Sequence, residues 1–101
     1  MRSLRGLAIG VIGAGTMGQA LITGLLSRGL SRRALLAADA NPVTRATVSR
    51  RFRIPVSADP LRVIRRSDVV ILAVKPQQLP ELVGALAPSL QRRHLVISIA
   101  A

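Results

Sequence analysis

The stretch Ile9-Gly10-Val11-Ile12-Gly13-Ala14-Gly15-Thr16-Met17-Gly18 decides the fold of this chain. It begins inside a short apolar run, residues 7–12, which is typical of a buried strand. After the glycines, apolar residues recur at helical spacing until Arg28-Gly29, a basic last turn with a glycine stop. A G-x-G-x-x-G sequence between a strand and a helix is typical of a loop that binds the phosphates of a dinucleotide.

Each glycine of this motif has a predicted role. Gly13 permits a tight turn, Gly15 lets the backbone approach a pyrophosphate, and Gly18 lets the helix pack closely on the strand. The first turn of the helix offers free N–H groups to the phosphates. The predicted phosphate site is therefore Gly13, Ala14, Gly15, Thr16, Met17 and Gly18. In the alternative interpretation, the glycines only form a turn.

Asp39 follows Gly18 by 21 residues, at the end of a second apolar run. An acid in this place accepts hydrogen bonds from ribose hydroxyls, which favours NAD over NADP. Asp39 could instead cap the helix that Asn41-Pro42 begins. Arg45, one helical turn further on, could receive a 2′-phosphate. These residues alone leave the choice between NAD and NADP open.

The remaining pattern alternates strands with helices. Strands are predicted at residues 7–12, 35–38, 54–56, 69–74 and 95–99, and helices at 17–28, 42–51, 59–66 and 79–86. Such alternation predicts an α/β fold in three layers, a Rossmann-type doubly wound parallel sheet of about five strands in the order 3-2-1-4-5. At 101 residues the chain is expected to form one domain.

Composition argues against several classes of protein. The net charge is +11, but the arginines are scattered and Phe52 is the only aromatic residue, so no nucleic-acid binding is expected. Cysteine is absent, and no metal site or nucleophile–base constellation is predicted. The N-terminal residues have the outline of a signal peptide, but glycines interrupt the apolar part. We expect a cytoplasmic protein without a membrane span.

Lys75 is the only lysine in a chain that otherwise uses arginine. It follows the strand predicted at 69–74, and the carboxyl edge of a parallel sheet is where ligands bind. We therefore expect Lys75 to reach a cofactor phosphate or a substrate carboxylate, although a solvated lysine before a proline turn is the alternative. His94, before the last strand, is expected on the surface.

Three segments together resemble the pyrroline-5-carboxylate reductase family: residues 9–18, the Val-Val-Ile-Leu-Ala-Val-Lys-Pro-Gln of 69–77, and the Val-Ile-Ser-Ile-Ala-Ala of 96–101. The resemblance implies an oxidoreductase that reduces the C=N bond of the small molecule 1-pyrroline-5-carboxylate with NADPH or NADH, giving L-proline. It also implies that Ala73, Val74 and Lys75 line the cofactor near its ribose and nicotinamide, with Ala101 beside the nicotinamide. Catalysis is expected from the cofactor, with no catalytic residue in this chain.

Two departures from the family qualify these expectations. The resemblance favours NADPH, but many relatives place Arg or Ser after the acid to bind the 2′-phosphate, and this chain has Ala40. Relatives continue into a helical domain that dimerises and forms the substrate pocket, which residues 1–101 lack. We therefore expect cofactor binding with little turnover, and a homo-oligomer only for a full-length protein. The alternatives are a non-catalytic NAD(P)-binding module that acts with a partner chain, and the nucleotide domain of another NAD(P)-dependent dehydrogenase.

Overall fold

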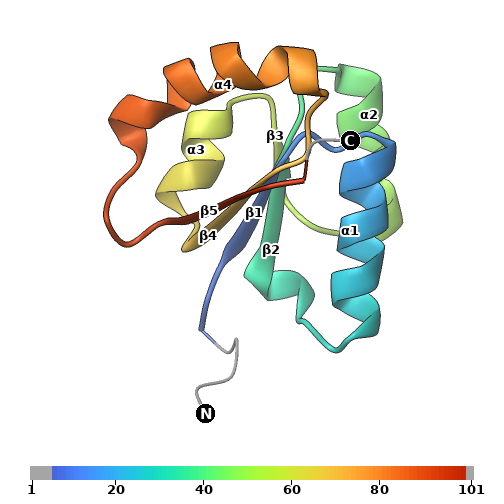
Figure 1. The fold of residues 1–101 in the computed structure, drawn as a ribbon. Coiled ribbons are helices and arrows are strands. Elements are labelled where there is room, and N and C mark those ends of the chain that lie inside the picture. The colour runs from blue at the N-terminus through green and yellow to red at the C-terminus, as the bar shows by residue number, and fades with distance from the viewer. Residues whose placement is uncertain (1–5, 100–101) are drawn as a thin grey trace.

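A parallel sheet with helices on both faces makes up the structure, a computed structural model that describes residues 6–99 (Figure 1). Its strands are β1 Ile9–Ile12, β2 Leu35–Ala38, β3 Val56–Ser57, β4 Val69–Leu72 and β5 Leu95–Ser98. They lie in the order β3-β2-β1-β4-β5, and every neighbouring pair is parallel. The predicted fold class and strand order are therefore confirmed.

The helices are α1 Thr16–Ser27, α2 Pro42–Phe52, α3 Pro60–Arg65 and α4 Leu79–Leu86. Three 3-10 turns join them to the strands: η1 Arg32–Ala34, η2 Pro76–Gln78 and η3 Ala87–Ser89. Figure 1 shows α1 and α2 on one face of the sheet and α3 and α4 on the other. None of the described helices is long and apolar enough to cross a membrane.

Two separate cores fill the spaces on either side of the sheet. Val11 and Leu35 pack with Ile22 of α1 and Val48 of α2, whereas the neighbouring Ile12 belongs to the core under α3 and α4. The strands are apolar on both faces because side chains alternate between two covered sides, as in other parallel sheets. This arrangement explains why the apolar runs in the sequence show no alternation.

Local signals set the helix starts. The Asn41 side chain accepts from the N–H of Val43 at 2.8 Å, and that of Asp59 accepts from Leu61 at 3.0 Å. Each cap precedes a proline at the first helical position, where a missing N–H costs nothing. Both helix starts agree with the sequence prediction.

Some strand ends were predicted too long. β4 ends at Leu72 rather than at residue 74. The Ala73 N–H still donates to the Ile12 carbonyl of β1 at 2.8 Å, and Ala73 and Val74 line a cavity. β3 comprises only Val56–Ser57, and the preceding Ile54 is buried in the core without being part of the strand. Apolar character alone does not separate strand residues from buried loop residues.

His94 is half-buried, not simply on the surface as predicted. Its Nδ1 accepts from the N–H of Gln91 at 2.8 Å, so the proton lies on Nε2, which donates to the Ile64 carbonyl at 3.0 Å. The histidine thus joins the turn before β5 to the end of α3.

Candidate functional site

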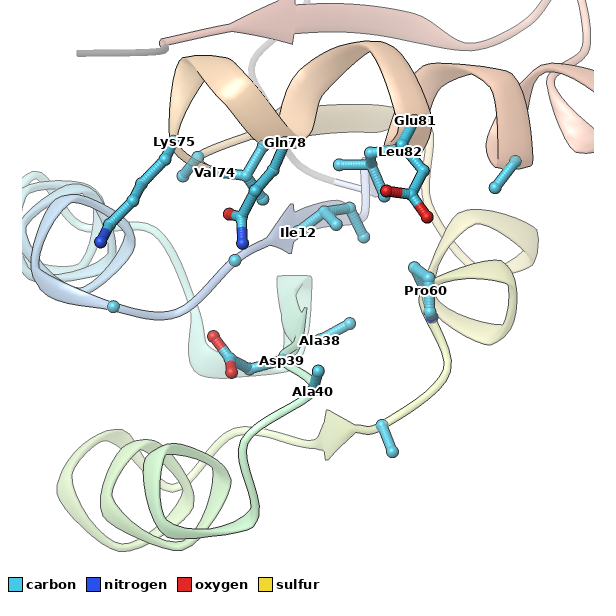
Figure 2. A pocket seen from close by; sticks show the side chains of 15 residues that line it. Ile12, Ala38, Asp39, Ala40, Pro60, Val74, Lys75, Gln78, Glu81 and Leu82 are labelled. Carbon is cyan, nitrogen blue, oxygen red and sulfur yellow. The ribbon is translucent and has the colours of Figure 1, made fainter.

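A cavity of about 520 Å³ opens at the carboxyl ends of β1, β2 and β4 (Figure 2). Such volumes are typical of small-molecule and cofactor sites. Seven residues predicted from the sequence line it, namely Gly13, Gly15, Asp39, Ala40, Ala73, Val74 and Lys75. They come from three separate stretches of the chain, which only the parallel sheet brings to one edge.

Gly13 and Gly18 form a close contact at the turn between β1 and α1. Gly13 has a φ of +95°, and a Cβ there would lie 2.8 Å from the Ala73 carbonyl oxygen. A Cβ on Gly18 would overlap the carbonyl oxygen of Gly13. Both positions require glycine for steric reasons inside the protein, as predicted for the turn and for the helix packing.

Gly15 is different, because the protein itself does not require a glycine there. Its φ of −76° and ψ of −155° are extended values open to any residue, and a Cβ would meet nothing within 4 Å. Gly15 is exposed and lines the cavity just before the first turn of α1. The bare backbone therefore leaves room for a ligand to approach the helix N-terminus closely.

The Asp39 carboxylate joins the end of β2 to the glycine loop. Its Oδ2 accepts from the N–H of Ala14 at 2.8 Å, and its Oδ1 accepts from the N–H of Asn41 at 2.9 Å. The cap of α2 is Asn41, so the alternative in which Asp39 caps this helix is wrong. Asp39 is a fixed carboxylate at the rim of the cavity, across from Lys75 (Figure 2).

Arg45 holds the same turn from outside the cavity. Its Nη1 donates to the carbonyl oxygens of Asp39, at 2.9 Å, and of Ala40, at 3.0 Å. It is not among the residues that line the cavity. The structure therefore gives Arg45 a role in fixing the backbone after β2.

The other predicted residues lie around the cavity rather than on its wall. Ala14 is fully buried and contributes its N–H to Asp39, while Thr16 and Met17 are exposed in the first turn of α1. Gly18 is buried below that turn. Ala101 lies outside the described residues.

One whole wall of the cavity, formed by α4 and the residue before it, was not predicted from the sequence. Gln78, Glu81, Leu82 and Ala85 all line the cavity. Their spacing of three, one and three residues places them on one face of a helix. Two polar residues three positions apart, Gln78 before α4 and Glu81 within this otherwise apolar helix, were the signal that could have revealed this wall. The other missed residues are Ile12, Ala38, Ala58 and Pro60.

No group of three or more His, Asp or Glu side chains that could hold a metal ion exists within residues 6–99. The charged side chains that line the cavity are Asp39, Lys75 and Glu81. The arrangement offers backbone N–H groups, one ammonium and two carboxylates around a mostly apolar space.

Comparison with known proteins places this site in a family. Residues 8–101 match the model of the family described as NADP oxidoreductase, coenzyme F420-dependent. The chain belongs to this family. The match includes the glycine loop, the end of β2 and the segment after β4, which together form most of the cavity.

The similarity to pyrroline-5-carboxylate reductases is also confirmed. The chain is 39% identical to the enzyme of that name from Pseudomonas aeruginosa over 93 residues, which cover 92% of this chain and 34% of the relative. This chain thus spans about a third of the relative's length.

Solved structures show the same fold. The pyrroline-5-carboxylate reductase of Coxiella burnetii has a TM-score of 0.88 and 26% identity, covering 94% of this chain and 36% of that one. Plasmodium falciparum pyrroline carboxylate reductase, solved with NADP bound, has a TM-score of 0.78 at 22% identity, covering 97% and 35%. The latter likeness is one of fold.

Proposed function

We propose that residues 1–101 form one NAD(P)-binding domain, and that this domain serves the reduction of 1-pyrroline-5-carboxylate to L-proline. One observation carries the proposal: the glycine loop, Asp39 and Lys75 surround a single cavity at the carboxyl edge of the sheet. The similarity to the Pseudomonas aeruginosa reductase supports the same chemistry, and the Plasmodium falciparum enzyme, which shares the fold, was solved with NADP bound.

The residues of the cavity fit a dinucleotide in a definite order. The open backbone at Gly15 and the first N–H groups of α1 would hold the pyrophosphate, with its negative charge at the positive end of the helix dipole. Asp39 would accept from the adenosine ribose, and Ala73 and Val74 would line the ribose-nicotinamide part. The bound cofactor would supply the hydride for the C=N carbon. This chain would position the cofactor without a catalytic residue of its own.

Substrate binding, in this proposal, belongs to a part of the protein outside this nucleotide domain. Positioning two reactants supplies a large part of an enzymatic rate, so the nucleotide domain by itself would show little turnover. We propose a homo-oligomer for a protein that carries both domains, and a cytoplasmic location where the biosynthetic substrate is found. Nucleic acid is not part of the proposed function.

Calorimetric titration of this chain with NADH and NADPH tests the binding step. We expect saturable binding of at least one dinucleotide, and its loss in Gly15→Asp, because the new carboxylate would occupy the space meant for phosphate. Gly24→Asp is the matched control, since Gly24 also has open space but lies further along α1. Unchanged binding by Gly15→Asp would refute the phosphate site.

The reaction itself is tested on the native protein isolated from its source. NAD(P)H consumption should depend on added 1-pyrroline-5-carboxylate. Activity with a 2-oxo acid in its place would favour a different dehydrogenase built on the same nucleotide domain.

A further inference from the structure

The Asp39 carboxylate is presented to the cavity in one fixed orientation. Each oxygen accepts one backbone N–H, from Ala14 at 2.8 Å and from Asn41 at 2.9 Å. An ionised carboxylate has about four lone-pair sites on its two oxygens, so each oxygen keeps acceptor capacity. It can accept from a hydroxyl group, but it has no proton to donate to a phosphate.

Beside Asp39, the cavity lining offers a 2′-phosphate no positively charged side chain. Ala40 lines the cavity and has no donor in its side chain. Arg45 lies outside the cavity lining, and its Nη1 donates to the carbonyls of Asp39 and Ala40. The only cation that lines the cavity among the described residues is Lys75, on the opposite wall (Figure 2).

Glu81 adds a second carboxylate to the same cavity. It lies in the first turn of α4, and Figure 2 shows its side chain pointing into the cavity above Pro60. Together with Asp39 and Lys75, it leaves the cavity lining with a net negative charge. A 2′-phosphate would bring about two further negative charges at neutral pH, and like charges in an interface are strongly unfavourable.

We infer that this cavity selects dinucleotides with a free 2′-hydroxyl, NAD(H), over dinucleotides with a 2′-phosphate, and that Asp39 and Ala40 determine the choice. The inference rests on the proposed function, because it concerns the ligand of the same cavity. Asp39 accepts from the ribose hydroxyls, and Ala40 leaves a 2′-phosphate without a partner.

Titration of this chain with NADH and with NADPH, under identical buffer and salt, tests the inference. We expect NADH to bind about tenfold more tightly than NADPH, or better. A tenfold difference is small compared with the full cost of placing like charges together. Equal binding, or tighter binding of NADPH, would overturn the inference and leave the proposed function intact. If neither dinucleotide binds, the proposed function fails and the preference fails with it.

A substitution at Ala40 locates the determinant. Ala40 is exposed, so a longer side chain can be accommodated without disturbing the core. Ala40→Arg should shift the ratio of the NADH and NADPH dissociation constants toward NADPH by about fivefold or more, through a charge-assisted contact with the phosphate. Ala46→Arg adds the same charge at an exposed position of α2 outside the cavity lining, and as the matched control it should leave this ratio unchanged. If Ala40→Arg does not discriminate between the dinucleotides, Ala40 does not face the 2′ position and the inference is wrong.

Discussion

Asp39 and Asp68 make the same local contact at opposite ends of β1, yet they differ in what their charge can do. Asp39 accepts from the N–H of Ala14, beyond the carboxyl end of the strand, and Asp68 accepts from the N–H of Ala8, before its amino end. Asp68 is paired with Arg93 at 3.2 Å. Asp39 has no such ion pair within residues 6–99 and lines the cavity instead.

The difference shows that the same contact, an aspartate that accepts a backbone N–H at the end of β1, can serve stability at one end and binding at the other. At the amino end, Arg93 also donates to the carbonyls of Ser67, at 2.7 Å, and Arg65, at 3.1 Å, so the charges and carbonyls satisfy one another. At the carboxyl end, the helices begin rather than end, and the start of α1, which has no side-chain cap, lies beside the cavity. The Asp39 carboxylate, which has no ion pair within residues 6–99, can therefore accept hydrogen bonds from a ligand in the cavity.

The largest expected effect comes from breaking the glycine contact that shapes the carboxyl end. Gly18→Ala should lower the free energy of unfolding by about 1–3 kcal/mol, because its Cβ would overlap the Gly13 carbonyl oxygen. Gly24→Ala, in the same helix with open space, should instead raise it by about 0.5–1 kcal/mol. Urea unfolding followed by circular dichroism measures both, and equal effects would contradict the packing described for Gly18.

The next effect separates the two aspartates by function. Asp39→Ala should weaken NADH binding by about tenfold or more, equivalent to about 1.4 kcal/mol, since it removes the acceptor for the ribose and loosens the N–H of Ala14. Asp68→Ala should leave the dissociation constant within about twofold. Calorimetry on both variants is the measurement. A similar loss of affinity in the two would mean that Asp39 acts only through the fold.

A smaller effect is expected at the amino end. Arg93→Ala should lower the free energy of unfolding by about 1 kcal/mol, because two backbone carbonyls and Asp68 lose a donor. Arg92→Ala, its exposed neighbour, should stay within about 0.5 kcal/mol of the parent. If both substitutions lower the free energy of unfolding equally, the hydrogen bonds made by Arg93 do not contribute to stability.

The smallest effect is the coupling between Asp68 and Arg93. Their side chains are 36% and 44% exposed, and ion pairs of this kind contribute about 0.5 kcal/mol. A double-mutant cycle with both alanine variants should return a coupling of this size. A coupling above about 2 kcal/mol, large even for contacting residues, would show that the ion pair, and not the carbonyl contacts, accounts for Arg93.

Much of the fold could be predicted because its signals are local. Asn41 and Asp59, each followed by proline, mark helix starts within three residues of themselves. The strand ends were less certain, since Ala73 and Ile54 are apolar and sheltered without lying in a strand. The partial burial of His94 could not be predicted because Ile64, the partner of its Nε2, lies 30 residues away in α3.

The sequence by itself determined the glycine loop, the order of strands and helices, and the acid at the end of β2. These features depend on the backbone freedom of glycine and on periodicity over a few residues, and both are visible in the sequence itself. Only the tertiary structure decided that Asp39 binds the N–H of Ala14, that Arg45 lies outside the cavity, and that Glu81 points into it. Such roles depend on which groups come together at the carboxyl edge of the sheet. These groups lie far apart along the chain, so sequence spacing alone does not show that they are close in space.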